Sequence, residues 1–349
     1  MKAHWIGLLA LACVFGCAPK EEANTSPGTP SDTGKKLSVV YIPKNTGNPY
    51  FNDVNRGFEE ACKEVGADFT TVGPASAEAT SQIPIIKEQI QRGVDVIAIS
   101  ANSKDALNPV LDQAKAKGIV VITVDSDLTD NESHRDACTI PTDFSKIGEG
   151  QVALLGKLIG NEGEIAILSA TTDATNQNAW IEKMKEELKK PEFSKMKLVE
   201  IVYGDDEPQK STTECEALLT KHPNLRGIIS PTTVGVAAAA QVLEQRGVYA
   251  GGPKAVGKGV ELTGLGTPDQ MRRFVESGVV KAFQLWAPYN EGFLAAYIGT
   301  QMKQGKLKPA AGMEIDVPKL GKRTFTEKLE LVGSPLVTFD KKNIGEYHF

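Results

Sequence analysis

The sequence predicts an α/β protein made of two doubly wound units, each a parallel sheet with helices on both faces. Short apolar runs alternate with segments of helical periodicity over residues 37–124, and the same alternation resumes after residue 145. Strands that alternate with helices in this way form parallel sheets covered by helices. Gly66, Gly93 and Gly118 stand just past expected helices, where a glycine readily takes the left-handed conformation that ends a helix.

The expected strands are short runs rich in β-branched residues, and the expected helices are segments in which apolar residues recur every three or four positions. In the first unit, strand and helix alternate over 37–42, 51–65, 68–72, 81–92, 94–100, 104–117 and 119–124. The second unit begins with a helix, and its elements are expected over 145–159, 163–169, 176–189, 198–203, 210–221, 227–230, 234–246, 260–264, 269–277 and 280–285. A long helix over 290–304 and a last strand over 336–339 follow.

The N-terminus has the pattern of an export signal over residues 1–17. A short polar start precedes an apolar run over 5–15, which is too short to span a bilayer. Residues 14–17 resemble a bacterial lipobox, which predicts lipidation of Cys17. Cys13 is a second candidate, and an ordinary secretory signal is the alternative.

Residues 18–36 are rich in Pro, Ser, Thr, Gly and charged side chains and show no apolar periodicity. Such a segment cannot bury enough surface to fold, so it predicts a flexible tether, with a ragged terminus as the alternative. Past the signal there is no further long apolar run, and the net charge of −5 comes from interspersed charges of both signs. A soluble body without a nucleic-acid surface is therefore expected.

Three cysteines, Cys62, Cys138 and Cys215, remain in the body. An odd number allows one disulfide at most. Because Cys62 and Cys215 fall in expected helices, buried thiols are favoured there.

Polar and aromatic side chains cluster directly after the expected strands. In open parallel sheets, ligands bind beyond the carboxyl ends of the strands. The clusters mix amide, hydroxyl, carboxylate and aromatic groups, as a sugar requires for its hydroxyls and its C–H faces. They occupy residues 43–51, 100–102, 125–127, 170–180, 231–233, 265–268 and 286–289.

In the first unit, Lys44 follows a buried strand and is either a ligand contact or a surface lysine. Asn48 precedes Pro49 and suits a helix start. Tyr50 and Phe51 are adjacent, so we expect one of them to face the cleft instead of the core. Asn102 follows the third strand as a further candidate.

Asp125 ends an apolar strand, where a carboxylate is costly unless it is paired. It therefore either caps the next turn or accepts hydrogen bonds from ligand hydroxyls, whereas Asp127 is expected to be an ordinary turn residue.

In the second unit, Asn176 is either a helix cap or a ligand contact. Gln177 and Trp180 lie three apart on one side of a helix, which suits an amide and an aromatic ring facing one ligand. Trp286 follows a strand and is a ligand contact or a tryptophan that packs at a hinge.

Motifs for nucleotide binding and catalysis are not complete. Residues 252–258 match a P-loop up to its lysine, but Gly259 replaces the Ser or Thr that binds magnesium. Residues 264–266 lack the third glycine of the dinucleotide fingerprint. There is no G-x-S-x-G elbow and the histidines are scattered. We expect no catalytic residue, no metal and no cofactor.

Residues 37–349 resemble periplasmic sugar-binding proteins of the ribose-binding type, in the branch that holds rhamnose-binding and autoinducer-2-binding proteins. The matching motifs are IPK and GNPYF within 42–51, GVDVIAIS at 93–100, VDSD at 124–127, ATNQNAW at 174–180, IISPTTVGVAAAA at 228–240 and TGLGTPDQMR at 263–272. The resemblance implies two doubly wound lobes joined by a three-stranded hinge, with crossings near Thr142, near Ala287 and near the C-terminus. The first lobe would combine 37–142 with about 288–331, and the second 143–287 with about 332–349.

The resemblance also implies a function and a set of contacts. The chain would be a monomeric, non-enzymatic solute receptor on the periplasmic or cell-surface side. It would touch the membrane through its lipid anchor alone and serve an ABC permease and its ATPase. Its lobes would close on a small sugar. Carried over position by position, the expected contacts are Lys44, Tyr50, Phe51, Asp125, Asn176, Gln177, Pro231 and Thr233, with Trp286 at a further contact position.

Two positions bear on the ligand. Autoinducer-2 receptors carry an aspartate where Asn176 stands and an alanine where Thr233 stands. Rhamnose or a related deoxyhexose or pyranose is therefore favoured, with autoinducer-2 or another polyol-like signal as the alternative. A sensor partner without transport also stays open, whereas a transcription regulator would need a helix-turn-helix before residue 37.

Overall fold

Two parallel sheets organise the chain, and they differ in strand order and in the helices that cover them. The structure is a computed structural model that describes Met1 and residues 35–349; the expected signal, Cys13, Cys17 and nearly all of the tether lie outside these residues. Residues 36–349 form one compact unit, which is described here by itself.

The first sheet has the strand order β13-β5-β4-β3-β1-β2, and every neighbouring pair in it is parallel. Its strands are β1 (Ser38–Ile42), β2 (Asp68–Thr71), β3 (Val96–Ile99), β4 (Val120–Val124), β5 (Ala137–Ile140) and β13 (Glu330–Val332). Its helices are α1 (Tyr50–Val65), α2 (Ile83–Arg92), α3 (Asn108–Ala116) and α9 (Pro288–Lys303). We call this sheet with these helices the first lobe.

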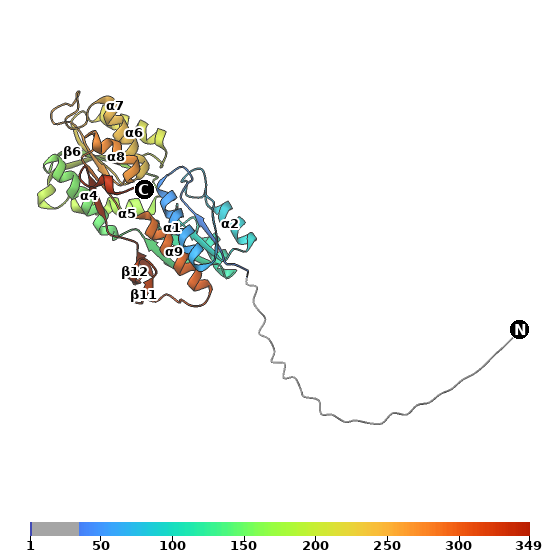
Figure 1. Cartoon of the computed structure of the whole chain (residues 1–349). Coiled ribbons are helices and arrows are strands. Elements are labelled where there is room, and N and C mark those ends of the chain that lie inside the picture. Colours follow the sequence, from blue (N-terminus) through green and yellow to red (C-terminus); the bar gives the residue numbers. More distant parts are fainter. Residues whose placement is uncertain (2–34) are drawn as a thin grey trace. The chain divides into compact units, whose positions relative to one another are not determined.

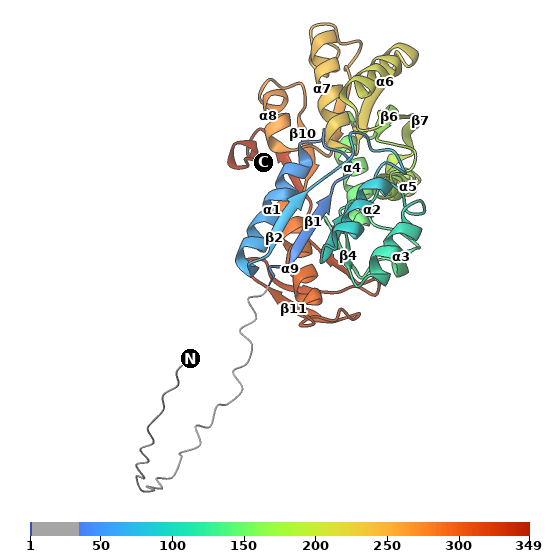
Figure 2. The ribbon, with the colours of Figure 1, turned by 90° about the vertical axis from the view of Figure 1, so that its right-hand side faces the viewer.

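Alternate residues of β1 face opposite sides of the first sheet. Val39 and Tyr41 belong to the core that includes α1 and α9. Val40 and Ile42 belong to a separate core with α2 and α3. Figure 2 shows α2 and α3 together, with α1 and α9 on the other side of the strands. Both faces of the sheet are thus buried, which explains why its strands read as continuous apolar runs.

Helices α1 and α9 cross at close range (Figure 1). A Cβ atom on Gly57 would lie 2.1 Å from the carbonyl oxygen of Tyr289, and one on Gly292 would lie 2.0 Å from that of Val54. Glycine at both positions therefore lets the two backbones touch, and this contact fixes where the first turns of α1 and α9 stand.

The second sheet has the parallel order β7-β6-β8-β9. Its strands are β6 (Glu162–Ser169), β7 (Lys195–Tyr203), β8 (Leu225–Ser230) and β9 (Glu261–Gly264). Its helices are α4 (Phe144–Ile159), α5 (Thr175–Glu187), α6 (Pro208–Lys221), α7 (Thr233–Arg246) and α8 (Pro268–Glu276). Helix α4 packs with α5 and α6 packs with α7, and Figure 1 shows the two pairs on opposite sides of this sheet.

β10 (Ala282–Leu285) lies beside the end of β9, where Gln284 forms a parallel β-bridge with Leu265. On its other side β10 pairs antiparallel with β14 (Val337–Asp340). We call the second sheet with α4 to α8, β10 and β14 the second lobe. A hairpin of β11 (Glu314–Val317) and β12 (Gly321–Thr324) lies between α9 and β13 along the chain. The short 3-10 helices are Glu132–His134, Pro191–Phe193 and Ile344–Glu346.

The chain passes between the sheets after β5, after β10 and after β13. The predicted fold class is confirmed, and most expected elements shift by a few residues at their ends. The strands β5 and β13 and the hairpin were not predicted. The pairing of β5 with β13 joins residues far apart in sequence, which a local pattern does not display.

The three body cysteines are buried and free. Cys62 lies in α1 and Cys215 in α6, as predicted for both, and Cys138 lies in β5. Across the part of the chain that the structure describes, no helix combines the length and the apolar character needed to cross a membrane.

Candidate ligand-binding site

A cavity of about 340 Å³, measured to the atom surfaces and including its mouth, lies where the carboxyl ends of strands from both lobes meet. The first lobe lines it with Lys44, Asn48, Tyr50, Phe51 and Asp125. The second lobe lines it with Asn176, Gln177, Trp180, Asp206, Pro231, Thr232, Thr233, Leu265, Leu285 and Trp286. All the predicted ligand contacts except Asn102 lie on this cavity.

Lys44, Asn176 and Asp125 form a hydrogen-bonded group that joins the lobes. Nζ of Lys44 donates to Oδ1 of Asn176 (2.7 Å), and Nδ2 of Asn176 donates to Oδ2 of Asp125 (3.1 Å). Nζ of Lys44 lies 4.0 Å from Oδ2 of Asp125. Asn176 is not the helix cap, because Ala174 occupies that position of α5. The side chain of Asn176 is therefore free to bridge the cleft.

Asp125 carries a perturbed carboxyl group. It follows β4 in the left-handed region, at φ 63°, and is 4% exposed. Burial raises its pKa to about 6, with Asp206 adding to the rise and the positive charge of Lys44 opposing it. The group therefore changes charge close to neutral pH and presents its oxygens to the cavity.

Asn48 fills two roles at once. Its Oδ1 accepts from the backbone N–H of Tyr50 (3.0 Å), which supports the start of α1. The same oxygen accepts from the hydroxyl of Thr233 (2.8 Å) in the second lobe. Asn48 therefore supports the start of α1, as predicted, and also lies at the predicted cleft.

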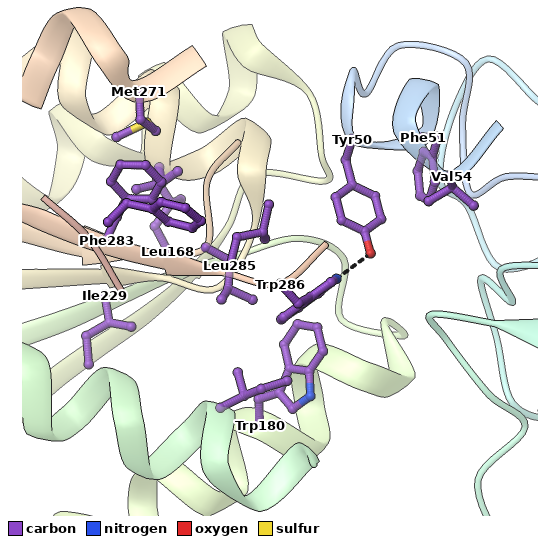
Figure 3. Close-up of a cluster of buried hydrophobic side chains, with 14 of the residues drawn as sticks. Tyr50, Phe51, Val54, Leu168, Trp180, Ile229, Met271, Phe283, Leu285 and Trp286 are labelled. Carbon is purple, nitrogen blue, oxygen red and sulfur yellow. Dashed lines mark hydrogen bonds between the residues drawn. The ribbon is translucent and has the colours of Figure 1, made fainter. Parts of the chain in front are cut away.

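Tyr50 and Phe51 both line the cavity and both pack in the core, so the pair reaches the cleft with two residues and not with one at the expense of the other. Their rings meet edge to face at a centroid distance of 5.2 Å, and α1 begins at the cavity wall. The Tyr50 hydroxyl accepts from the indole N–H of Trp286 (2.8 Å) and donates to Oε1 of Glu291 (2.6 Å). Figure 3 shows Tyr50 reaching Trp286 from the opposite lobe.

Trp286 and Trp180 form the aromatic wall of the cavity (Figure 3), with centroids 5.8 Å apart. Gln177 lies one turn before Trp180, and its Oε1 accepts from the Ser169 hydroxyl and the Ala170 N–H, both at 2.8 Å. These bonds anchor the start of α5 to the end of β6. A rigid aromatic wall beside fixed polar groups suits a ligand with both C–H faces and hydroxyls.

Two residues have roles other than those predicted. Nδ2 of Asn102 donates to the carbonyl oxygen of Lys44 (2.9 Å), so Asn102 supports the Lys44 loop and does not line the cavity. Asp127 is not an ordinary turn residue, because both its oxygens accept from the buried guanidinium of Arg135 at 2.6 Å. Their charges compensate each other inside the first lobe.

The structure adds cavity and near-cavity residues that the sequence analysis missed. Asp206, in the turn after β7, lines the cavity beside Thr232. The rule that polar groups cluster after strands would have found it. Glu291 lies within α9 and is fully buried under Tyr50, with a pKa raised well above its usual range by burial and by Asp125. Leu265 and Leu285 add apolar lining.

The described residues contain no cluster of three or more His, Cys, Asp or Glu side chains that could hold a metal ion. The cavity lining consists of hydrogen-bonding groups, aromatic faces and a few apolar side chains.

Residues 39–307 match the family described as the periplasmic binding protein domain. The chain belongs to this family. The predicted type I periplasmic sugar-binding family is thereby confirmed at the level of the fold and the matched domain.

Three known proteins illustrate the likeness. A solute-binding protein of an ABC transporter from Clostridium phytofermentans, solved with bound L-rhamnose, is 34% identical with a TM-score of 0.83, over 90% of this chain and 98% of that one. A sugar ABC transporter structure from Actinomyces odontolyticus is 37% identical with a TM-score of 0.70, over the same shares. The D-ribose/D-allose-binding protein of Pseudomonas aeruginosa is 25% identical over 65% of this chain and 72% of its own length.

Proposed function

We propose that this chain is a non-enzymatic, extracytoplasmic sugar-binding protein that delivers a monosaccharide to the permease and ATPase of an ABC importer. One observation carries the proposal: polar groups and aromatic rings from both lobes converge on one cavity. A ligand that touches both lobes stabilises the closed form over an open one, which is how such proteins couple capture to a change of shape.

The cavity supports a ligand of one sugar ring. Lys44 supplies a cationic donor, Asp125 supplies carboxylate acceptors, and Trp286 supplies a flat apolar face. This combination matches a pyranose, which alternates hydroxyls with C–H surface.

Rhamnose or a related deoxyhexose is the ligand that we favour. Asn176 and Thr233, which differ from the autoinducer-2 pattern, both lie on the cavity wall. The relative that is 34% identical to this chain was solved with L-rhamnose. A panel of L-rhamnose, D-ribose, D-allose and autoinducer-2, screened by thermal shift, distinguishes these ligands because a ligand that binds the native state raises its melting temperature.

Asp125→Ala tests the site. The buried carboxylate is expected to accept hydrogen bonds from ligand hydroxyls, so calorimetric affinity for the best sugar should fall about 10- to 100-fold. Asp316→Ala, on the exposed hairpin, is the matched control and should bind normally. Unchanged affinity in Asp125→Ala would show that the site assignment is wrong.

We further propose that the chain is a lipoprotein anchored at Cys17 on the periplasmic or cell-surface side, and acts as a monomer. The lipobox-like residues 14–17 and the polar segment 18–36 support the anchor. The lobe bounds we propose are 37–142 with about 288–331, and 143–287 with about 332–349. Metabolic labelling with radioactive palmitate should mark the wild type and leave Cys17→Ser unlabelled, with Cys13→Ser labelled as the control.

A further inference from the structure

Asp206 lies in a tight turn between β7 and α6. The turn is held to the end of β6 by backbone hydrogen bonds from Gly204 to Ser169 (2.9 Å) and from Asp205 to Ala170 (3.1 Å). Asp205 and Asp206 both take the left-handed conformation, at φ 55° and 54°. Two consecutive non-glycine residues in this region are unusual. The turn places the Asp206 side chain inside the protein.

The Asp206 carboxylate is buried but incompletely paired. The residue is 6% exposed, and its Oδ1 accepts a hydrogen bond from the Thr232 hydroxyl. Its Oδ2 accepts none from the residues that the structure describes, although Asp206 lines the cavity. A buried carboxylate gains from each hydrogen bond it receives, so this oxygen has capacity for a donor in the cavity.

Asp206 and Asp125 line the cavity from opposite lobes, together with Lys44, whose Nζ lies 4.0 Å from Oδ2 of Asp125. The positive charge of Lys44 lowers the pKa of each carboxyl, whereas burial raises both. The cavity lining thus contains two carboxyl groups and one ammonium group, and a ligand enters a site with an excess of acceptors and negative charge. An anionic ligand would meet repulsion in a low-dielectric environment, where charge interactions are strong.

We propose that Asp206 is a ligand-recognition residue: its Oδ2 accepts a hydroxyl of the sugar, and with Asp125 it restricts the site to uncharged polyhydroxyl ligands over sugar acids. This inference rests on the proposed sugar-binding function and adds a second-lobe carboxylate to it. Thr232 is the positioning residue, because its hydroxyl holds Oδ1 and so orients the carboxylate.

The neighbouring Asp205 is a matched control. It shares the turn and the left-handed conformation, but its carboxylate pairs with Lys210 at the surface, where its side chain is 38% exposed. Exposed ion pairs contribute little to stability, and asparagine tolerates the left-handed region as aspartate does. Asp205→Asn therefore makes the same Asp-to-Asn substitution in the same turn and leaves the cavity lining unchanged.

The experiment is calorimetric titration of wild type, Asp206→Asn and Asp205→Asn with L-rhamnose, or whichever neutral sugar of the panel binds most tightly, and with glucuronate. Replacing a charge-assisted acceptor by a neutral one should weaken neutral-sugar binding about 10- to 100-fold in Asp206→Asn. Asp205→Asn should bind within about 2-fold of wild type, since it keeps every group that lines the cavity. Wild type should prefer the neutral sugar to glucuronate, and Asp206→Asn should reduce that preference.

The outcomes separate the two proposals. If wild type binds no sugar of the panel, the proposed function fails and this inference falls with it. If wild type binds sugar and Asp206→Asn binds it equally well, or both variants weaken equally, the inference alone is overturned. The same holds if wild type binds glucuronate as tightly as the neutral sugar. Circular dichroism and the melting temperature of each free variant show whether it is folded. Thr232→Val, which leaves Asp206 in place, supplies a second test and should lose less sugar affinity than Asp206→Asn.

Discussion

Asp125 combines burial, an unusual backbone conformation and a place on the cavity wall. Its carboxyl is paired in part by Asn176, while Lys44 stands 4.0 Å away. Burial nonetheless dominates, and the pKa rises from 3.8 to about 6. Before a ligand supplies hydrogen bonds, ionisation of this carboxyl is thus less favourable than in water.

This raised pKa makes the stability of the free protein depend on pH. A carboxyl whose folded pKa exceeds its unfolded value contributes stability below the unfolded value, and this stability is lost as pH rises through the folded value. We expect wild type to lose about 2 kcal/mol relative to Asp125→Asn between pH 4 and pH 7. Melting temperatures of both proteins across this range measure the effect. A difference that does not vary with pH would contradict it.

At the scale of elements, the contact between α1 and α9 sets the position of Tyr50 above Glu291. Tyr50 begins α1 and Glu291 lies in the first turn of α9, and their side chains share a 2.6 Å hydrogen bond. Because Gly57 and Gly292 let the backbones touch, the crossing determines how far the Tyr50 hydroxyl reaches toward Trp286.

Adding a methyl group at this crossing should be destabilising. Gly57→Ala or Gly292→Ala places a Cβ about 2 Å from a backbone oxygen, and overpacking of this kind costs about 1–3 kcal/mol. Chemical denaturation should show the loss as a lower midpoint. Glu59→Ala, on the exposed side of α1, is the control and should stay within about 0.5 kcal/mol of wild type. Wild-type stability in Gly57→Ala would argue against a tight crossing.

At the scale of the whole molecule, the lobes touch through side chains that meet at the cavity. The pairs are Lys44 with Asn176, Asn48 with Thr233, and Tyr50 with Trp286. Each pair loses its bond when the lobes separate. The free energy of these bonds therefore adds to that of the ligand in favouring the closed form.

Removing one such pair should favour separation of the lobes. Thr233→Val keeps the side-chain shape but loses the bond to Asn48, worth about 1 kcal/mol, so sugar affinity should fall about 5-fold. Small-angle X-ray scattering should report a smaller radius of gyration with saturating sugar in the wild type. The free Thr233→Val protein should be at least as expanded as the free wild type. A radius that sugar leaves unchanged would show that the lobes do not close on it.

Much of this protein follows from local sequence patterns. The alternation of apolar runs with helical segments predicted two doubly wound sheets, because burial on both faces requires strands such as Ser38–Ile42 to be apolar throughout. The rule that polar groups follow strands identified Lys44, Asp125 and Gln177 at the cavity. These features depend on periodicity and chain order, which a sequence displays directly.

The tertiary structure decided what depends on contacts between distant residues. The bond between Asn102 and the Lys44 loop, the pairing of Asp127 with Arg135, and the burial of Glu291 under Tyr50 join segments with no local signature. Whether a polar side chain faces a ligand or another part of the protein is set by which groups the two lobes bring within hydrogen-bonding distance. Asp206 shows the difference most clearly, because its position after a strand was visible in the sequence, whereas its burial and its incompletely paired oxygen appear only in the tertiary structure.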